Sequence, residues 1–139
     1  MASEAADRAP AAVRRLHPMR LLLVSDDRGF CGVTSLLLER NGFAVRTTTH
    51  SAPVRLAELA REHRADVVLV DEEPSRRRAA RTLAGLELLY PRARPLILRA
   101  DGDAPPPGVA HHVGRSSPVA ELMAAVERCY AGERPRAAS

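Results

Sequence analysis

The sequence contains no lysine and no tryptophan, and it has only two phenylalanines and two tyrosines. All 21 basic residues are therefore arginines, set against 17 acidic residues for a formal net charge of +4. Arginine in place of lysine throughout, together with abundant alanine, indicates a compositional bias, so the basic pI is a weak argument for nucleic acid. The scarcity of aromatic rings also argues against base stacking. Direct nucleic-acid binding is not favoured.

Cysteine and long apolar runs are also scarce. Cys31 and Cys129 are the only cysteines, too few and too far apart in sequence for a disulfide framework or a zinc finger. Both are expected to be packing residues or free thiols of a reducing compartment. No apolar stretch approaches the roughly 18 residues that a membrane span needs, and residues 1–18 lack the apolar core of a signal peptide. We therefore expect a cytoplasmic, soluble protein with no membrane partner.

The length of 139 residues and the 45% of hydrophobic residues suit one domain with a real core. Residues 1–18 are rich in Ala, Arg and Pro, show no sustained period and predict a flexible N-terminal tail. The domain is expected over residues 19–132. Residues 133–139 then form a short polar C-terminal tail.

Two apolar runs end on aspartate. Residues 21–24 lead into Ser25, Asp26 and Asp27, and residues 67–70 lead into Asp71. Continuous apolar runs of this length, each followed by a helical pattern, predict strands buried on both faces of a parallel sheet. Because ligands of such sheets bind outside the carboxyl ends of the strands, both acids should lie on the same rim. Carboxylates in that position suit a divalent cation or phosphoryl chemistry.

Strand-like and helix-like segments alternate along the chain, which predicts an α/β fold of right-handed parallel units. Apolar residues at helical spacing predict a helix after each of the first three strands. They predict another from Ser117 and Pro118 to Gly132, with Ser117 as the N-cap. The run from Asp101 to Gly108 contains three consecutive prolines and cannot hold a long helix. The expected strands are residues 21–24, 43–48, 65–71, 95–98 and 109–113.

These segments resemble the receiver domain of bacterial two-component response regulators, in particular receivers that precede LuxR-type DNA-binding domains. The resemblance covers about residues 19–132 and implies a flavodoxin-like, five-stranded parallel sheet with helices on both faces, the fourth helix being shortened or absent. The matching pieces occur in order and at the expected spacing. They are residues 21–27, 37–43, 65–71, 90–98 with Tyr90 and Pro91 before the strand, and 121–133.

The resemblance also implies roles for individual residues. Asp71 takes the place of the phosphoacceptor, whose carboxylate oxygen attacks a phosphoryl group carried by a histidine kinase. Asp26, Asp71 and the backbone carbonyl of Glu73 take the places of ligands to Mg²⁺. That cation offsets the repulsion between carboxylates and phosphoryl oxygens.

Several positions of the expected site depart from the family pattern. Ser25 stands where the first acid of the family's acidic pair is expected, with Asp26 as the second, so Mg²⁺ should bind weakly. Ala100 stands where a Thr or Ser hydroxyl bonds the phosphoryl group, so the switch should be missing. Arg115 replaces a lysine, which keeps the charge but changes the geometry. His112 occupies the position of the switch aromatic residue.

The neighbouring charged residues have plainer interpretations. Asp27 is expected to be the N-cap of the first helix rather than a metal ligand. An arginine cluster, Arg76, Arg77, Arg78 and Arg81, could contact DNA or an acidic partner, but a solvated helix face is the better interpretation.

Two functions remain open. The first is a degenerate, stand-alone receiver that binds proteins in signalling, with phosphorylation of Asp71 weakened or lost. The second is a competent phosphoacceptor in a phosphorelay, and a truncated LuxR-type regulator is a weaker third alternative. None of these is an enzyme in the ordinary sense. The implied partners are a histidine kinase or a downstream regulatory protein, and a homodimer is a further alternative.

Overall fold

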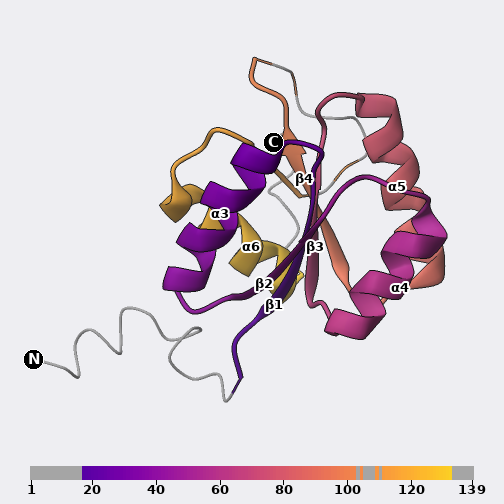
Figure 1. The fold of residues 1–139 in the computed structure, drawn as a ribbon, viewed down its shortest axis with the longest axis horizontal. Coiled ribbons are helices and arrows are strands. Elements are labelled where there is room, and N and C mark those ends of the chain that lie inside the picture. Colours follow the sequence, from indigo (N-terminus) through magenta and orange to yellow (C-terminus); the bar gives the residue numbers. More distant parts are fainter. Residues whose placement is uncertain (1–16, 103, 105–108, 110, 133–139) are drawn as a thin grey trace, which may run out of the picture.

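The computed structural model describes residues 17–102, 104, 109 and 111–132. Within these residues, strands and helices alternate as the hydrophobic pattern predicts (Figure 1). Their order is β1 (Arg20–Val24), α3 (Arg28–Arg40), β2 (Ala44–Thr48), α4 (Pro53–His63), β3 (Val67–Asp71), α5 (Arg76–Leu89), β4 (Arg94–Arg99), β5 (His112–Gly114) and α6 (Val119–Ala131).

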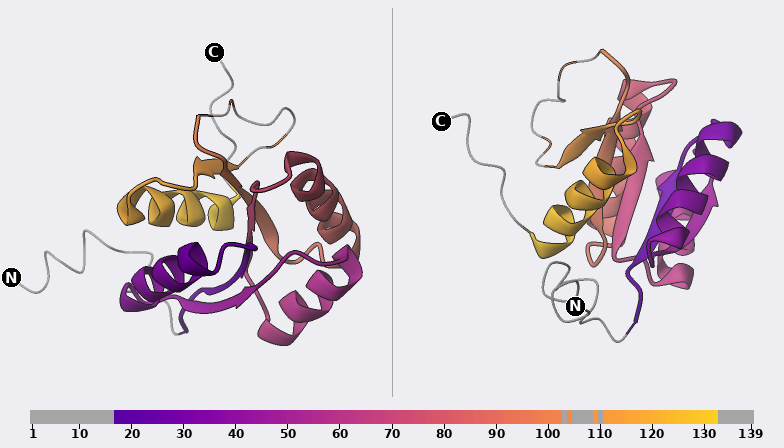
Figure 2. Two further views of the ribbon diagram at one scale, coloured as in Figure 1. Left: turned by 45° about the horizontal axis from the view of Figure 1, so that its top comes forward. Right: turned by 90° about the vertical axis from the view of Figure 1, so that its left-hand side faces the viewer.

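The five strands form one parallel sheet in the order β2-β1-β3-β4-β5. Helices α3 and α6 cover one face of the sheet, and α4 and α5 cover the other (Figure 2). This doubly wound arrangement is the flavodoxin-like fold predicted from the sequence. The order places β1 and β3 side by side at the centre of the sheet, so the two strands that end on acids are neighbours.

Successive side chains of the central strands enter two different cores. Leu21 and Leu23 pack with α3 and α6, whereas Leu22 and Val24 pack with α4 and α5. Strand β3 alternates in the same way, and every residue of it is buried. The apolar runs are continuous because both faces of the sheet are covered by helices.

Side-chain caps fix where two helices begin. The carboxylate of Asp27 accepts a hydrogen bond from the backbone N–H of Phe30 at the start of α3, which confirms the expected cap. Ser75 caps α5 in the same way through the N–H of Arg78.

The two cysteines are buried, and burial raises the pKa of the Cys129 thiol to about 11.

Several strand ends differ from the sequence prediction by one or two residues, and two further differences concern β5 and the start of α6. Strand β5 covers His112–Gly114 rather than residues 109–113, and it pairs with the last part of β4. Helix α6 has Pro118 as its N-cap residue, whereas Ser117 belongs to the preceding turn and donates its N–H to the carbonyl of Gly114. Proline fits this cap because its φ of −56° lies within the range fixed by its ring.

The connection between β4 and β5 has no helix among its described residues, 100–102, 104, 109 and 111, as the proline run predicts. The three consecutive prolines, at 105–107, and residues 103, 108 and 110 lie outside the described residues. The part of the chain that the structure describes holds four helices, two on each face of the sheet. None of those helices is long and apolar enough to cross a membrane.

The packing of α4 on α5 depends on a glycine. A Cβ atom placed on Gly85 would lie 2.4 Å from the Cβ of Pro53, the first residue of α4. No side-chain rotation can relieve a contact between two Cβ atoms. The helices can therefore approach this closely only if residue 85 has no side chain.

We expect Gly85→Ala to lower the free energy of unfolding by about 1–3 kcal/mol through overpacking. Gly32→Ala is the matched control, because Gly32 lies in α3 with no atom within 4 Å of an added Cβ. That variant should be stabilised by roughly 0.5–1 kcal/mol through the gain in helix propensity. Urea unfolding followed by circular dichroism measures both, and equal stability changes would contradict the close packing.

Candidate functional site

The carboxyl ends of β1 and β3 bring the predicted acid pair to one rim of the sheet. Val24 is paired with Val70, so Ser25 and Asp71 follow at the same level of neighbouring strands. Asp71 is fully buried, with 0% of its surface exposed, and Ser25 is 2% exposed. The rim therefore contains a buried carboxylate, which requires compensation by charge or hydrogen bonds.

Both oxygens of Asp71 are engaged. Oδ1 accepts hydrogen bonds from the backbone N–H of Glu73 at 3.0 Å and from Nε of Arg115 at 3.2 Å. Oδ2 accepts from the Ser25 hydroxyl at 2.6 Å and from Nη2 of Arg115 at 3.1 Å. Arg115 thus holds the carboxylate with two N–H groups of its planar fork, the geometry that makes Arg–carboxylate pairs strong.

Arg115 is itself held from two further sides. Its guanidinium lies 4.3 Å from the ring centroid of Phe30, and Nη2 is 3.2 Å from the carboxylate of Asp27. Its side chain is only 14% exposed. Burial acts to lower the pKa of Arg115, but the hydrogen bonds to Asp71 and Asp27 outweigh it and raise the pKa. The guanidinium is a fixed cation of the site.

Asp26 has a different set of partners from Asp71. Its carboxylate accepts a hydrogen bond of 2.8 Å from the backbone N–H of His50 and forms an ion pair with Arg78 of α5. The pKa of Asp26 is lowered, first by the His50 N–H and further by Arg78. His50 also connects the two acids, because its Nε2 lies 3.0 Å from the backbone oxygen of Asp71. Each acid of the predicted pair therefore has its own arginine.

This arrangement suits a divalent cation poorly. Asp26 and Asp71 carry oxygen donors of the type that Mg²⁺ prefers, but Arg78 and Arg115 already neutralise them. The contact that the structure gives for Glu73 is the hydrogen bond from its backbone N–H to Asp71. The role of its backbone carbonyl as a ligand stays a prediction. Within residues 17–102, 104, 109 and 111–132, no group of three His, Cys, Asp or Glu side chains could hold a metal ion.

The degenerate positions predicted from the sequence lie around the same rim. The methyl side chain of Ala100 has no hydrogen-bonding group, but its backbone N–H donates to Oε1 of Glu72 at 3.1 Å. His112 accepts a hydrogen bond of 3.0 Å from Nε of Arg99 through Nδ1. Burial, followed by the nearby charge of Arg99, lowers the pKa of His112.

Sequence reasoning missed Glu72 and the ion pairs of the arginine cluster. The side chains of Arg76 and Arg78 are each 43% exposed, in keeping with the expected solvated face, but Arg78 also pairs with Asp26 and Arg76 pairs with Glu72. A signal was present in the sequence. Several arginines and no acid occupy the first turn of α5, where the helix dipole disfavours cations, so these side chains need anionic partners elsewhere.

Comparison with known proteins identifies the fold. No family profile and no curated protein sequence matches the chain, but many solved structures do. A LuxR-family two-component response regulator from Aurantimonas sp. SI85-9A1 is 26% identical, with a TM-score of 0.61 over 84% of this chain and 88% of that chain.

Two other solved structures agree at lower identity. A response regulator from Burkholderia pseudomallei, with a phosphorylated aspartic acid, a calcium ion and citrate, is 24% identical (TM-score 0.65; 82% of this chain, 69% of that chain). The Vibrio cholerae chemotaxis protein CheY4 is 16% identical (TM-score 0.67; 81% of this chain, 98% of that chain).

The sheet order and the acids at its rim define the class as a receiver-type α/β domain. More particularly, the chain has the fold of the receiver domains of two-component response regulators, as the sequence resemblance predicted.

We expect Ser25→Asp to tighten Mg²⁺ binding by about tenfold, because it adds a carboxylate beside Asp71 and offsets part of the Arg115 charge. Isothermal titration calorimetry measures the affinity directly, and this chain has no tryptophan to report binding by fluorescence. Ser35→Asp, further along α3, adds the same charge as a control. Equal Mg²⁺ affinity in wild type and Ser25→Asp would show that Ser25 is not what weakens the site.

Proposed function

We propose that this domain acts in two-component signalling as a protein-binding receiver in which phosphorylation of Asp71 is weakened or lost. The observation that carries this proposal is the bidentate hydrogen bonding of Arg115 to both carboxylate oxygens of Asp71. The partner is a histidine kinase or a downstream regulatory protein. Mg²⁺ binding, where it occurs, is weak.

The contact bears directly on phosphoryl transfer. To attack phosphorus, a carboxylate must present an oxygen with a free lone pair to the incoming group. Each oxygen of Asp71 accepts two hydrogen bonds, and the side chain is fully buried. A phosphodonor would have to displace Arg115 before it reached Asp71, and the ring of Phe30 and the carboxylate of Asp27 hold Arg115 in place.

The same region supports an output that does not depend on phosphate. A modification shifts a conformational equilibrium only if it makes different contacts in the two states. Ala100 has no hydroxyl with which to contact a phosphoryl group, and His112 is bonded to Arg99. We therefore assign output to a single conformation that phosphorylation does not change.

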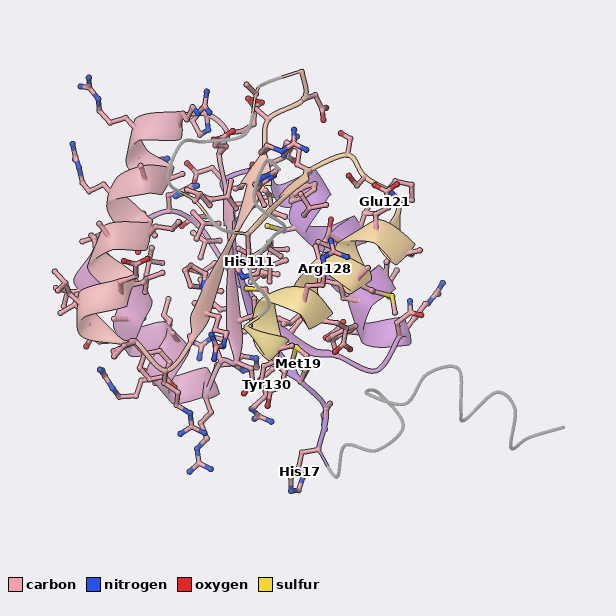
Figure 3. All side chains as sticks on the ribbon, turned by 180° about the vertical axis from the view of Figure 1, so that it is seen from behind. His17, Met19, His111, Glu121, Arg128 and Tyr130 are labelled. Carbon is pink, nitrogen blue, oxygen red and sulfur yellow. The ribbon has the colours of Figure 1, made fainter. Side chains whose placement is uncertain are left out.

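The binding surface in this proposal is formed by β5 and α6. Glu121, Arg128 and Tyr130 lie on exposed positions of α6 (Figure 3). Charged groups on such a surface guide association and set the choice of partner. A second copy of the domain is an alternative occupant of this surface, which makes a homodimer.

A competent phosphoacceptor is the second candidate function. It is favoured by the presence of both an aspartate and a cationic side chain at the expected positions, and by the phosphorylated aspartic acid of the Burkholderia neighbour. In that case Arg115 would move from the carboxylate to the phosphoryl oxygens. Phosphate incorporation distinguishes the two functions.

We expect little phosphoryl incorporation when the protein is treated with acetyl phosphate and Mg²⁺. Arg115→Lys should raise it several-fold, because a compact ammonium cannot bond both carboxylate oxygens as the guanidinium does. Intact mass spectrometry reads the added phosphate, with Asp71→Asn as the blank and the exposed Arg128→Lys as the matched control. Stoichiometric labelling of the wild type would establish the second candidate instead.

We also expect Asp71→Asn to leave cellular output nearly intact, since output does not require a phosphoryl group. The test compares transcript profiles of a deletion strain complemented with wild type, Asp71→Asn or Arg128→Glu. Wild type and Asp71→Asn should restore the profile equally, whereas the charge reversal on α6 should restore less. Loss of output in a folded Asp71→Asn protein would overturn the proposal.

A further inference from the structure

Glu72 is a buried acid beside Asp71 that the proposed function does not use. Its backbone N–H donates to the carbonyl of Leu98, so the pairing of β3 with β4 continues one residue beyond Asp71. Because successive side chains of a strand point to opposite faces, Glu72 is directed away from the Asp71 site. Its side chain is only 1% exposed.

The carboxylate of Glu72 is bound to the segment that follows β4. Oε1 accepts the backbone N–H of Ala100 at 3.1 Å, and Oε2 lies 3.1 Å from Nε of Arg76 on the first turn of α5. A buried carboxylate is stable only when its charge is compensated. Arg76 supplies that compensation, and the Ala100 N–H supplies a hydrogen bond to a charged acceptor, which is stronger than a neutral one.

Arg76 makes a second contact with the same segment. Its Nη2 donates to the backbone carbonyl of Ala104 at 2.9 Å. The paired side chains therefore bind the chain after β4 at two points, Glu72 at Ala100 and Arg76 at Ala104. Both are backbone contacts, so they do not depend on the side chains of the segment.

We infer that Glu72 and Arg76 hold Ala100 and Ala104, which follow β4, in one fixed position, independently of the state of Asp71. Asp71 is engaged by Ser25, Glu73 and Arg115, and none of the contacts of Glu72 with Ala100 and Arg76 passes through it. Asp71 at the end of β3 and Glu72 directly after it thus have different roles. This inference goes beyond the proposed function, because it holds whether or not Asp71 accepts phosphate.

The inference is tested by amide hydrogen exchange of Ala100, measured by NMR without phosphodonor or metal. The Ala100 amide should be protected in the wild type, and Glu72→Ala should speed its exchange at least about tenfold by removing the acceptor. Glu73→Ala is the matched control, since the adjacent Glu73 side chain is exposed. Asp71→Asn should leave the Ala100 rate unchanged.

A second pair of variants covers the case in which Glu72→Ala does not fold. Arg76→Met removes the cation that orients Glu72 and should speed Ala100 exchange about threefold or more. Arg77→Met removes the same charge one residue further along an exposed part of α5 and should have no effect. The inference is overturned if Ala100 exchange is unchanged in folded Glu72→Ala or Arg76→Met, or if Asp71→Asn speeds it as much as they do.

Discussion

The buried carboxylate of Asp71 at the end of β3 requires a cation beside it, and its ion pair with Arg115 supplies that cation. A fully buried carboxylate at the end of a central strand would be strongly destabilising without a cation beside it. Arg115 reaches it from the loop between β5 and α6 and contacts Phe30 and Asp27 at the start of α3. One side chain therefore joins three parts of the fold that are distant in sequence. Any ligand that enters the site must compete with this internal partner.

The same pairing recurs around the rim. Asp26 is paired with Arg78, Glu72 with Arg76, and Asp71 with Arg115. In each pair the cation belongs to a later segment than the acid, so folding of the chain brings each acid its arginine. Guanidinium groups suit this role, because their planar N–H groups match carboxylates and they remain charged when partly buried. A chain without lysine has no other basic side chain, apart from histidine, for these positions.

The sequence was sufficient for the strands and the rim because those features follow from short-range patterns. The apolar runs before Asp26 and Asp71 located β1 and β3, and the parallel arrangement then placed both ends together. The sequence was not sufficient for the partners of each acid. The contact of Glu72 with Ala100 joins the residues that directly follow β3 and β4, and no periodicity specifies it. The predicted bounds of β5 were wrong for a related reason. A three-residue edge strand is defined by its pairing with β4 rather than by its own pattern.

Asp27 shows how closely local and long-range structure are combined at this rim. Its Oδ1 accepts the N–H of Phe30 at the first turn of α3, and its Oδ2 binds Arg115. Serine, threonine or asparagine would serve as well as aspartate for a helix cap alone. Only a carboxylate also supplies charge to Arg115. Asparagine at position 27 would therefore keep the start of α3 but remove one of the two carboxylates that bind Arg115, so the residue that caps one helix also sets how firmly this arginine is held.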